Sequence, residues 1–512
     1  MSKQTKDKLI LLINSLNKSE KRSFRLYVNR NGGSSESKFV LLFNQLEKDG
    51  LFNEEKVLKN IPEIQKKQLS NIKANLYKQL LTCLRLIERS KIGEIEVREQ
   101  IDFAKILYEK GLYKSCLEIL DKAKKQALAI NFETLALSIL YFEKRIESQH
   151  VTGSMSEKAE ILVKQSNNLL EDIDKTNQLS NLSLLLYGRY LKYGYVKNEN
   201  DYKALKVFFS EHLPKLDPLE LSFYQKLYLY QSHVWYYNMA QDFVSCYKYS
   251  QKWVDLFCEN PKLIPNSAAT YVKGIHNVLN SLFMSGSRIR FNESFIQYED
   301  FQIEKIENVS RNEISNYYLF YHTHSLNKML INGMYENNDS ELEAIRILIS
   351  RNEYNWDINR ILVLKYKLAC VYFGNNDLDN CIECLNDITV KNYPSFREDI
   401  QSFARILNLI AHFDLGNEEL VTYKLKSLYR YLGNLKDLET VQIEIIRFLR
   451  RTTVMDANKM KREFKDLRDK LMIVKNRPYE KRPFLYLDII SWLEAKMNGT
   501  TIGEVIKRKI YG

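Results

Sequence analysis

A short pattern recurs at three places in this chain of 512 residues, and it describes how two helices meet. In each copy a helix ends at a short turn, a large apolar residue begins the next helix, and a Cys follows three residues later. One helical turn separates the two, so both lie on the same face of the second helix. The pattern therefore predicts stacked helical hairpins. Its residues are Ala104, Gly111, Tyr113, Cys116 and Ala123; Val234, Phe243 and Cys246; and Ala369, Asn376, Leu378 and Cys381.

The composition favours helix nearly throughout the chain. Only 17 Gly and 8 Pro occur in 512 residues, and both residue types interrupt helices. The seven Cys residues are odd in number and scattered over predicted helices, which favours reduced thiols and a cytoplasmic location. No apolar stretch approaches the roughly 18 residues that a membrane span needs, so we expect no membrane partner.

The three copies resemble the tetratricopeptide-repeat superfamily. That family has a small residue in the first helix, a Gly or polar turn seven residues later, then an aromatic residue and a small residue in the second helix. Cys116 stands where the family usually has Ala. Ala104, Val234 and Ala369 lie 130 and 135 residues apart, and each gap is close to four units of about 34 residues. The resemblance implies an all-α, right-handed α-solenoid.

Charge divides the chain into three parts. Residues 1–90 carry a net charge of +9, residues 441–512 carry +8, and the middle carries −5. We expect an N-terminal basic helical domain (1–95), a central set of repeats (96–440) and a C-terminal basic helical cap (441–512).

Outside the repeats, apolar spacing and turn residues predict individual helices. The expected ranges are about 3–15, 20–29, 38–48, 54–60 and 62–90 near the start, and 456–474, 484–497 and 502–510 near the end. Ser19 and Asn53 are candidate caps, and a loop is expected over 31–37. The segments beginning at Leu16 and Tyr486 are similar to a widespread group of bacterial repeat proteins of unknown function.

The residues that often carry chemistry are not arranged for it. Cys381 and Cys384 form a C-x-x-C pair, but no second pair or nearby His completes a zinc site, so packing is the favoured interpretation. His322 and His324 are two residues apart and point to different sides of a helix. The chain has no G-x-S-x-G, phosphate-binding Gly loop or H-E-x-x-H. We therefore expect a non-catalytic protein without cofactor or metal.

A dense aromatic patch allows two interpretations. Its residues can grip a peptide, because Tyr and Trp anchor many interfaces, or they can fill the space between stacked helices. The second interpretation is favoured because helix pairs need large apolar residues at this spacing. The candidate partner-binding residues are Tyr224, Tyr228, Trp235 and Tyr236.

Basic residues at both ends also allow two interpretations. They can contact phosphates, and the segment 54–60 with the helix after Pro62 is faintly typical of a helix-turn-helix. They can equally be solvated surface charge, which is the more frequent outcome. The candidate phosphate-binding residues are Lys21, Arg22, Arg25, Lys461, Lys465 and Arg468.

These observations predict an interaction scaffold or adaptor that binds a protein or peptide segment in a superhelical groove, and the basic ends favour an acidic partner. The alternative is a nucleic-acid-associated regulator, in which the basic ends bind phosphate and the repeats bind a partner. The two differ in salt dependence, because phosphate binding weakens steeply as salt rises.

Overall fold

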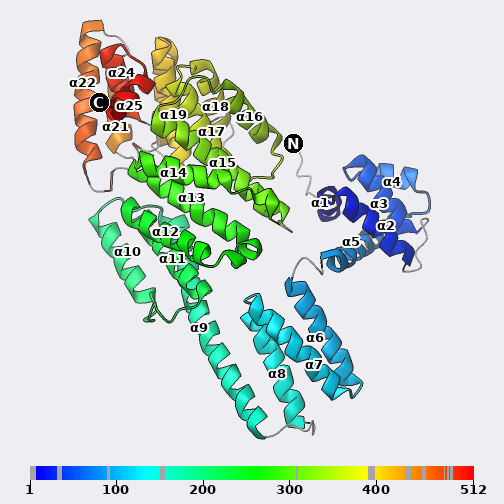
Figure 1. Cartoon of the computed structure of the whole chain (residues 1–512). Coiled ribbons are helices and arrows are strands. Elements are labelled where there is room, and N and C mark those ends of the chain that lie inside the picture. The colour runs from blue at the N-terminus through cyan, green and yellow to red at the C-terminus, as the bar shows by residue number, and fades with distance from the viewer. Residues whose placement is uncertain are drawn as a thin grey trace. The chain divides into compact units, whose positions relative to one another are not determined.

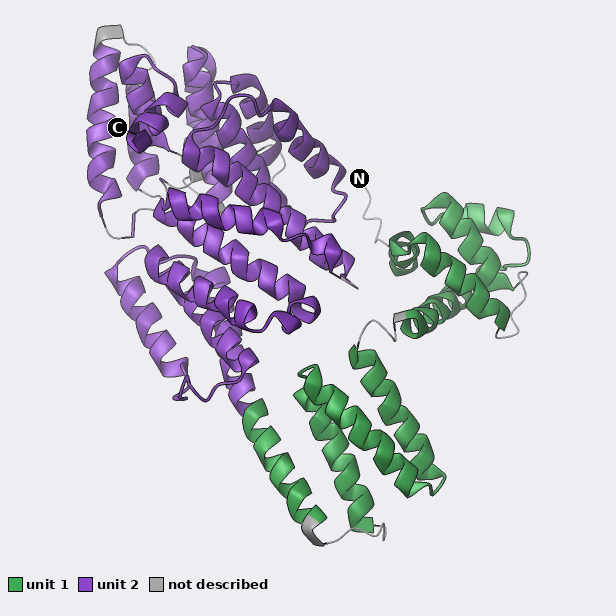
Figure 2. Cartoon of the chain, in the orientation of Figure 1, with its two compact units in different colours: residues 1–173 green, residues 174–512 purple. Residues whose placement is uncertain are grey.

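A computed structural model describes residues 7–30, 37–88, 93–149, 156–306, 309–389, 398–432, 440–452, 457–477, 479–480, 484 and 488–511. Every regular element within these ranges is a helix, which confirms the all-α prediction (Figure 1). The chain forms two compact units, residues 1–173 and 174–512, and the division falls inside helix α9 (Ser156–Tyr193) (Figure 2). The boundaries expected at 95 and 440 stay predictions. Among the described helices, none combines the length and apolarity that crossing a bilayer requires.

Unit 1 contains two hydrophobic cores. The first lies among α1 to α5, and the second lies among α6 to α8 and the first part of α9. The helices are α1 (Lys8–Ser15), α2 (Lys18–Arg30), α3 (Lys38–Asp49), α4 (Glu54–Asn60), α5 (Lys66–Glu88), α6 (Gly93–Glu109), α7 (Tyr113–Ala129) and α8 (Glu133–Gln149).

Two helix starts in unit 1 differ from the sequence prediction. Helix α2 begins at Lys18, one residue before the cap expected at Ser19. Asn17 caps it instead, because its side chain accepts a hydrogen bond from the Glu20 amide (2.9 Å) and its own amide donates to the Glu20 carboxylate (2.7 Å). The cap expected at Asn53 is confirmed by its 3.0 Å bond from the Lys56 amide.

Helix α5 begins at Lys66 rather than near Pro62. The turn between α4 and α5 buries Ile61 and Ile64 in the first core, and the Ile64 amide donates to the Ile61 carbonyl (3.0 Å). Anchoring both side chains in the core holds the chain in a turn until after Ile64. Residues 31–36 of the expected loop and 3–6 of the first expected helix lie outside the described residues.

Unit 2 is built of helical hairpins packed side by side. Helices α13, α15, α17, α19 and α21 pack one against the next. Helices α13, α17, α19 and α21 also pack on the second helix of their own hairpin, and α15 packs on α14. The helices are α10 (Glu199–His212), α11 (Phe223–Met239), α12 (Phe243–Glu259), α13 (Ala268–Ser285), α14 (Arg288–Asp300), α15 (Arg311–Asn332), α16 (Asp339–Arg351), α17 (Ile358–Gly374), α18 (Leu378–Thr389), α19 (Glu398–Asp414), α20 (Glu418–Leu432), α21 (Thr440–Thr452), α22 (Ala457–Lys475), α24 (Ile489–Asn498) and α25 (Ile502–Tyr511). We call α11, α13, α15 and α17 the first-helix row, and α12, α14, α16 and α18 the second-helix row.

One turn geometry recurs at six hairpins. A residue with φ between 59° and 75° ends the first helix, and the amide after it donates to a carbonyl five residues back at 2.8–3.0 Å. The residue five positions after the turn is at most 3 % exposed. This is the Schellman arrangement, which stops a helix and fixes where the next one starts. The turn residues are Gly111, Asn131, Gln241, Gly286, Asn376 and Gly416, and the buried residues are Cys116, Ala136, Cys246, Phe291, Cys381 and Val421.

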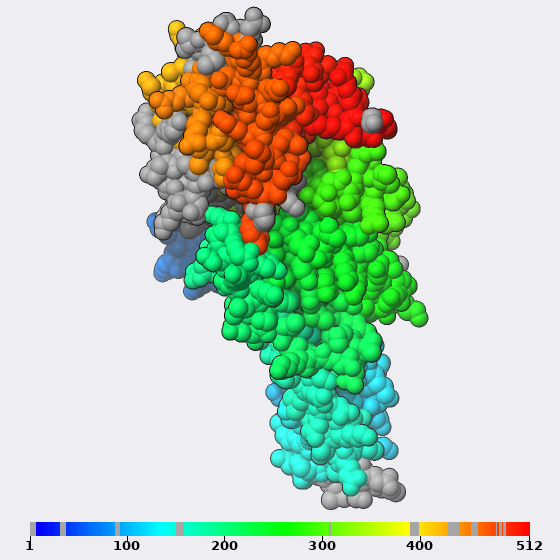
Figure 3. Space-filling view, turned by 90° about the vertical axis from the view of Figure 1, so that its left-hand side faces the viewer, coloured from blue at the N-terminus to red at the C-terminus, as the bar shows by residue number. Residues whose placement is uncertain are grey.

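A contact between residues far apart in sequence closes unit 2 on itself. The side-chain amide of Gln241 donates hydrogen bonds to the backbone carbonyls of Val196 (2.8 Å) and Tyr479 (3.0 Å). The Tyr479 hydroxyl donates to the Glu199 carboxylate (2.9 Å). Figure 3 shows the short segment after α22, in orange-red, against α10, in teal. The C-terminal helices are therefore attached to the first hairpins of the unit.

The C-terminal helices pack through the apolar stripe that the sequence predicted. Phe464, Leu467, Leu471 and Val474 of α22 are buried. The last long helix begins at Ile489 rather than Phe484, after a cap at Asp488, and residues 485–487 are outside the described ranges. Helix α22 packs on α24, whose Trp492 indole donates to Asp414 (2.9 Å).

Candidate functional site

The residues of the recurring pattern lie inside the helix pairs. Ala104, Cys116, Ala123, Ala369 and Cys381 have no exposed surface. Phe243, Cys246 and Leu378 are also buried, Tyr113 is half-buried at the start of α7, and Gly111 ends α6 with φ of 75°. These positions build the scaffold and face no solvent-filled site.

The C-x-x-C pair lies in the same environment. Burial raises the pKa of Cys384 to about 11 and the pKa of Cys381 well above its usual value. Both sulfurs are therefore protonated at neutral pH, whereas metal binding and redox exchange use the thiolate. Within the described residues no group of three or more His, Cys, Asp or Glu side chains is placed to hold a metal ion.

The four aromatic candidates do not form one exposed patch. Tyr236 is buried and stacks on Phe209, with ring centroids 4.4 Å apart. Trp235 is half-buried and packs against Tyr187 and Tyr190 of α9. Tyr224 and Tyr228 are half-buried, and the Tyr224 hydroxyl lies 3.2 Å from Ser267.

The six basic candidates fall into paired and unpaired groups. Lys21 and Arg25 both pair with Glu47, and Arg468 pairs with its neighbour Asp469 (2.6 Å). Arg22, Lys461 and Lys465 are exposed on α2 and α22. Their role in phosphate binding stays a prediction.

The structure reveals a different charged feature, a separation of charge between the two helix rows. The first-helix row carries one carboxylate, Glu313, and seven cations. The second-helix row carries eleven carboxylates and six cations. The cations of the first-helix row are Lys226, Lys273, Arg311, Lys328, Arg360, Lys365 and Lys367. A net charge averaged over the central region hides this alternation, so the sequence analysis missed it.

A hydrogen-bonded chain links three helices of the first-helix row. The Lys367 ammonium donates to the Asn327 side-chain oxygen (2.6 Å), so the Asn327 nitrogen faces His324 Nδ1 (3.2 Å). A lysine ammonium can only donate, and this sets the direction of the chain. His324 must then carry its proton on Nε2 and donate to His276 Nδ1 (2.9 Å). His276 therefore keeps its proton on Nε2.

Burial holds both histidines in the neutral form that this chain requires. Burial lowers the pKa of His276 to about 3, and the nearby charges of Lys273, Arg360 and Lys367 lower it further. The pKa of His324 lies well below its usual value for the same main reason. The chain thus ends in a neutral N–H donor on the half-buried ring of His276, and this Nε2–H has no hydrogen-bond partner within the described residues.

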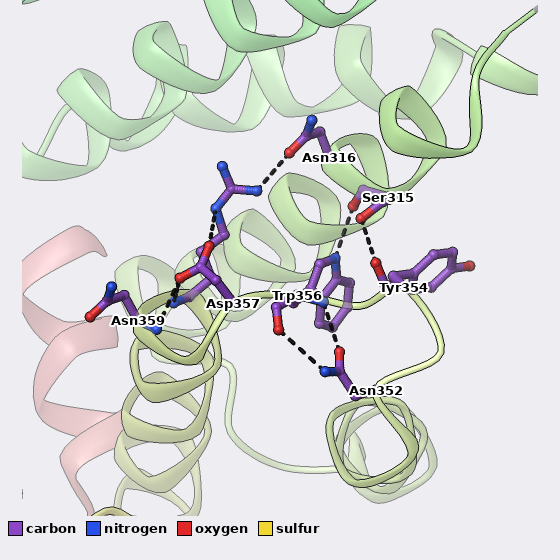
Figure 4. Close-up of polar contacts among 8 residues, drawn as sticks. Ser315, Asn316, Asn352, Tyr354, Trp356, Asp357 and Asn359 are labelled. Atoms are coloured by element: carbon purple, nitrogen blue, oxygen red, sulfur yellow. Dashed lines mark hydrogen bonds and ion pairs between the residues drawn. The ribbon is translucent and has the colours of Figure 1, made fainter. Parts of the chain in front are cut away.

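Arg360 is fixed at the junction of α15 and α17, between Asn316 and Asp357, both of which are labelled in Figure 4. It donates to Asn316 of α15 (2.7 Å) and pairs with Asp357, the cap of α17 (3.0 Å). The buried Trp356 closes the same junction, because its indole donates to the Ser315 carbonyl (3.0 Å). The guanidinium is therefore held in place before any ligand arrives.

Lys273 is the most available cation of this group. Its side chain is exposed, yet neighbouring protein atoms and the charge of Arg360 lower its pKa. The Lys273 side chain is therefore flanked by protein atoms, which lower its pKa, and is still open to water, which accounts for its exposure. Within the described residues its ammonium has no carboxylate partner. We call Lys273, His276, His324, Asn327, Arg360 and Lys367 the Lys–His cluster.

The chemical groups of the Lys–His cluster suit an anionic ligand. It offers the exposed Lys273 ammonium and a neutral N–H donor on the half-buried ring of His276, which stacks on Phe320 (3.9 Å). Comparisons with protein-family models, curated proteins and solved structures found no match for this chain. The resemblance to tetratricopeptide repeats therefore stays a prediction.

Proposed function

We propose that the chain is a non-catalytic, cytoplasmic interaction protein of the tetratricopeptide-like class. Its first-helix row forms the concave side of a right-handed solenoid and binds an acidic protein segment. The separation of charge between the two helix rows carries this proposal. Lys328, Lys365 and Arg360 pair with Glu299, Asp387 and Asp357. The positive charge without a described carboxylate partner includes Lys226, Lys273 and Arg311, and an acidic ligand relieves the repulsion among such cations.

The chemistry of the Lys–His cluster favours a peptide as the acidic ligand. Lys273 suits a carboxylate, while the neutral His276 N–H suits a peptide carbonyl. Phe320 beside them offers apolar contact, which a folded repeat groove commonly supplies to an extended or helical segment. The carboxylates of the second-helix row disfavour a polyanion that wraps around the hairpins.

The test is the affinity of a fluorescein-labelled acidic peptide for the wild type and for Lys273→Glu, measured by fluorescence anisotropy. Lys273 makes no described hydrogen bond through its ammonium, so the substitution leaves packing intact. Reversing one contacting charge is expected to weaken binding at least tenfold, which corresponds to about 1.4 kcal/mol. The same peptide with Gln and Asn in place of Glu and Asp should bind no better to the wild type than to the variant.

Lys426→Glu is the matched control, because Lys426 is an exposed lysine of α20 outside the first-helix row. It changes the net charge equally and should leave the affinity within twofold. Equal losses in both variants, or no affinity of the wild type for the acidic peptide, would refute the proposal.

A further inference from the structure

Helix α5 of unit 1 presents a long exposed face that packing of the first core does not use. Leu69, Leu76, Leu80 and Cys83 point into that core. The opposite face follows helical spacing, and its six residues are Lys67, Asn71, Ala74, Lys78, Leu81 and Arg85. We call these the α5 face. At 1.5 Å per residue it extends about 27 Å along the helix.

Within the described residues, five cations around this core pair with carboxylates, whereas those of the α5 face, like Arg22 and Lys59, do not. Lys21 and Arg25 pair with Glu47, Lys56 pairs with Asp49 (2.6 Å), and Lys66 pairs with Glu54 (3.3 Å); Lys73 pairs with Asp7. Within the described residues, Lys67, Lys78 and Arg85 have no carboxylate partner. The single acidic residue in the sequence of α5 is Glu88, at its last position. Three positive charges are thus kept unneutralised on one exposed face.

The shape of this face suits the major groove of a DNA duplex. A helix with its side chains is about 10–12 Å across, close to the width of the major groove at about 12 Å. Ala74 is small and lies at the middle of the face, so the helix backbone can approach the bases closely. Asn71 is exposed beside it, and Asn is a residue type that reads adenine in this groove. The major groove of an RNA duplex is too narrow and deep for a helix.

The local arrangement supports the same use. The short helix α4 and a turn precede α5, and Ile61 and Ile64 anchor that turn in the core. Helix α5 itself packs on α2 and α3, so it is held against the core as helix-turn-helix proteins hold their groove-binding helix. We propose that the α5 face binds double-stranded DNA, with Lys67, Lys78 and Arg85 on phosphates and Asn71 near the base edges. The sequence also indicated a helix-turn-helix here, but it placed the candidate phosphate contacts at Lys21, Arg22, Arg25, Lys461, Lys465 and Arg468.

The test uses the full chain and a fluorescein-labelled 20-base-pair duplex of mixed sequence, with anisotropy measured at several salt concentrations. We compare the wild type with the triple variant Lys67→Gln, Lys78→Gln, Arg85→Gln. The variant should bind at least tenfold more weakly. The slope of log K against log salt should be less steep by about 2–3, since each lost phosphate contact removes about 0.9.

A second variant, Ala74→Glu, places a carboxylate at the middle of the face and should weaken binding similarly. All four positions are exposed, and melting by circular dichroism checks that each variant is folded. The matched control is Lys203→Gln, Lys206→Gln, Lys426→Gln, which removes the same charge at exposed lysines of α10 and α20 and should bind as the wild type does.

Four results would overturn the proposal. They are no binding of the duplex by the wild type at about 50 mM salt, unchanged binding by both α5 variants, equal losses in the control, and tighter binding of a matched RNA duplex. Loss of acidic-peptide binding in the α5 variants instead of DNA binding would show that the face docks a protein. The four results that overturn DNA binding leave the proposed peptide site at the Lys–His cluster untouched, because that site is tested by its own variants.

Discussion

At the scale of single residues, small buried side chains decide how closely the hairpins pack. Cys381 follows the turn residue Asn376 by five positions and has no exposed surface. Its pKa is raised by burial, so it acts as a small apolar side chain and not as a reactive thiol.

Enlarging Cys381 is therefore expected to destabilise the fold. Cys381→Leu should lower the free energy of unfolding by about 1–3 kcal/mol, because a well-packed site cannot admit extra methyl groups without strain. Cys258→Leu is the control, since Cys258 is exposed and surface substitutions usually change stability by less than about 0.5 kcal/mol. Urea denaturation measures both. An unchanged midpoint for Cys381→Leu would contradict the packing role.

The neutral histidines predict a loss of stability in acid. The pKa of His276 is about 3 in the folded chain and about 6.5 when unfolded, so the unfolded chain takes up the proton first as pH falls. The contribution of neutral His276 to the free energy of unfolding is therefore present above about pH 6.5 and declines as the pH falls below that value. His276 alone should contribute a loss of about 1–2 kcal/mol between pH 6.5 and 5.

His276→Gln should reduce this pH dependence, with thermal melting at pH 7 and pH 5 as the measurement. His322 keeps a part of the dependence in this variant, because burial lowers its pKa to about 4. His212→Gln, at an exposed histidine of α10, should melt with the wild-type pH dependence. An equal pH dependence in wild type and His276→Gln would contradict the neutral chain.

At the scale of elements, the sequence predicted which segments are helical. It did not predict several of the residues at which helices begin, or the candidate site. Apolar spacing predicted α3 and α22 to within one or two residues. The start of α5 was missed because tertiary burial of Ile61 and Ile64 overrides the usual preference of Pro62 for a helix start. The turn at Asn131 went unnoticed, although Asn131 and Ala136 repeat the spacing of Gly111 and Cys116.

The Lys–His cluster could not be predicted from the sequence, because it forms only where α13, α15 and α17 pack together. Lys273, His324 and Lys367 are distant in sequence, and no local spacing joins them. The alternation of charge was present in the sequence, but it becomes visible only once the first and second helices of each hairpin are assigned.

Close approach between elements predicts opposite outcomes for two glycines. A Cβ at Gly374 of α17 would lie 2.5 Å from the ring of buried Tyr335, whereas a Cβ at Gly188 of α9 would meet nothing within 4 Å. Gly374→Ala should therefore destabilise by about 1–3 kcal/mol. Gly188→Ala should stabilise by about 0.5–1 kcal/mol, as usual for a helix interior. Thermal melting of both variants checks the signs, and a stabilised Gly374→Ala would contradict the described packing of α17 on Tyr335.

At the scale of the whole molecule, each unit has its own proposed ligand. Unit 2 is closed by the contacts of Tyr479 with Gln241 and Glu199, and its first-helix row gathers the cations. Unit 1 carries the α5 face. We therefore expect the two proposed activities, binding of an acidic protein segment and binding of DNA, to be lost separately on substitution in one unit or the other.

Hydrogen–deuterium exchange with and without the acidic peptide tests the central claim most directly, because it locates the peptide on the chain. We predict slower exchange in α13, α15 and α17, near Lys273 and Arg360, and unchanged exchange in the acidic helices α14, α16 and α18. Lys273→Glu should remove the protection. Protection of the second-helix row, or of unit 1 alone, would contradict the assignment of the acidic segment to the first-helix row.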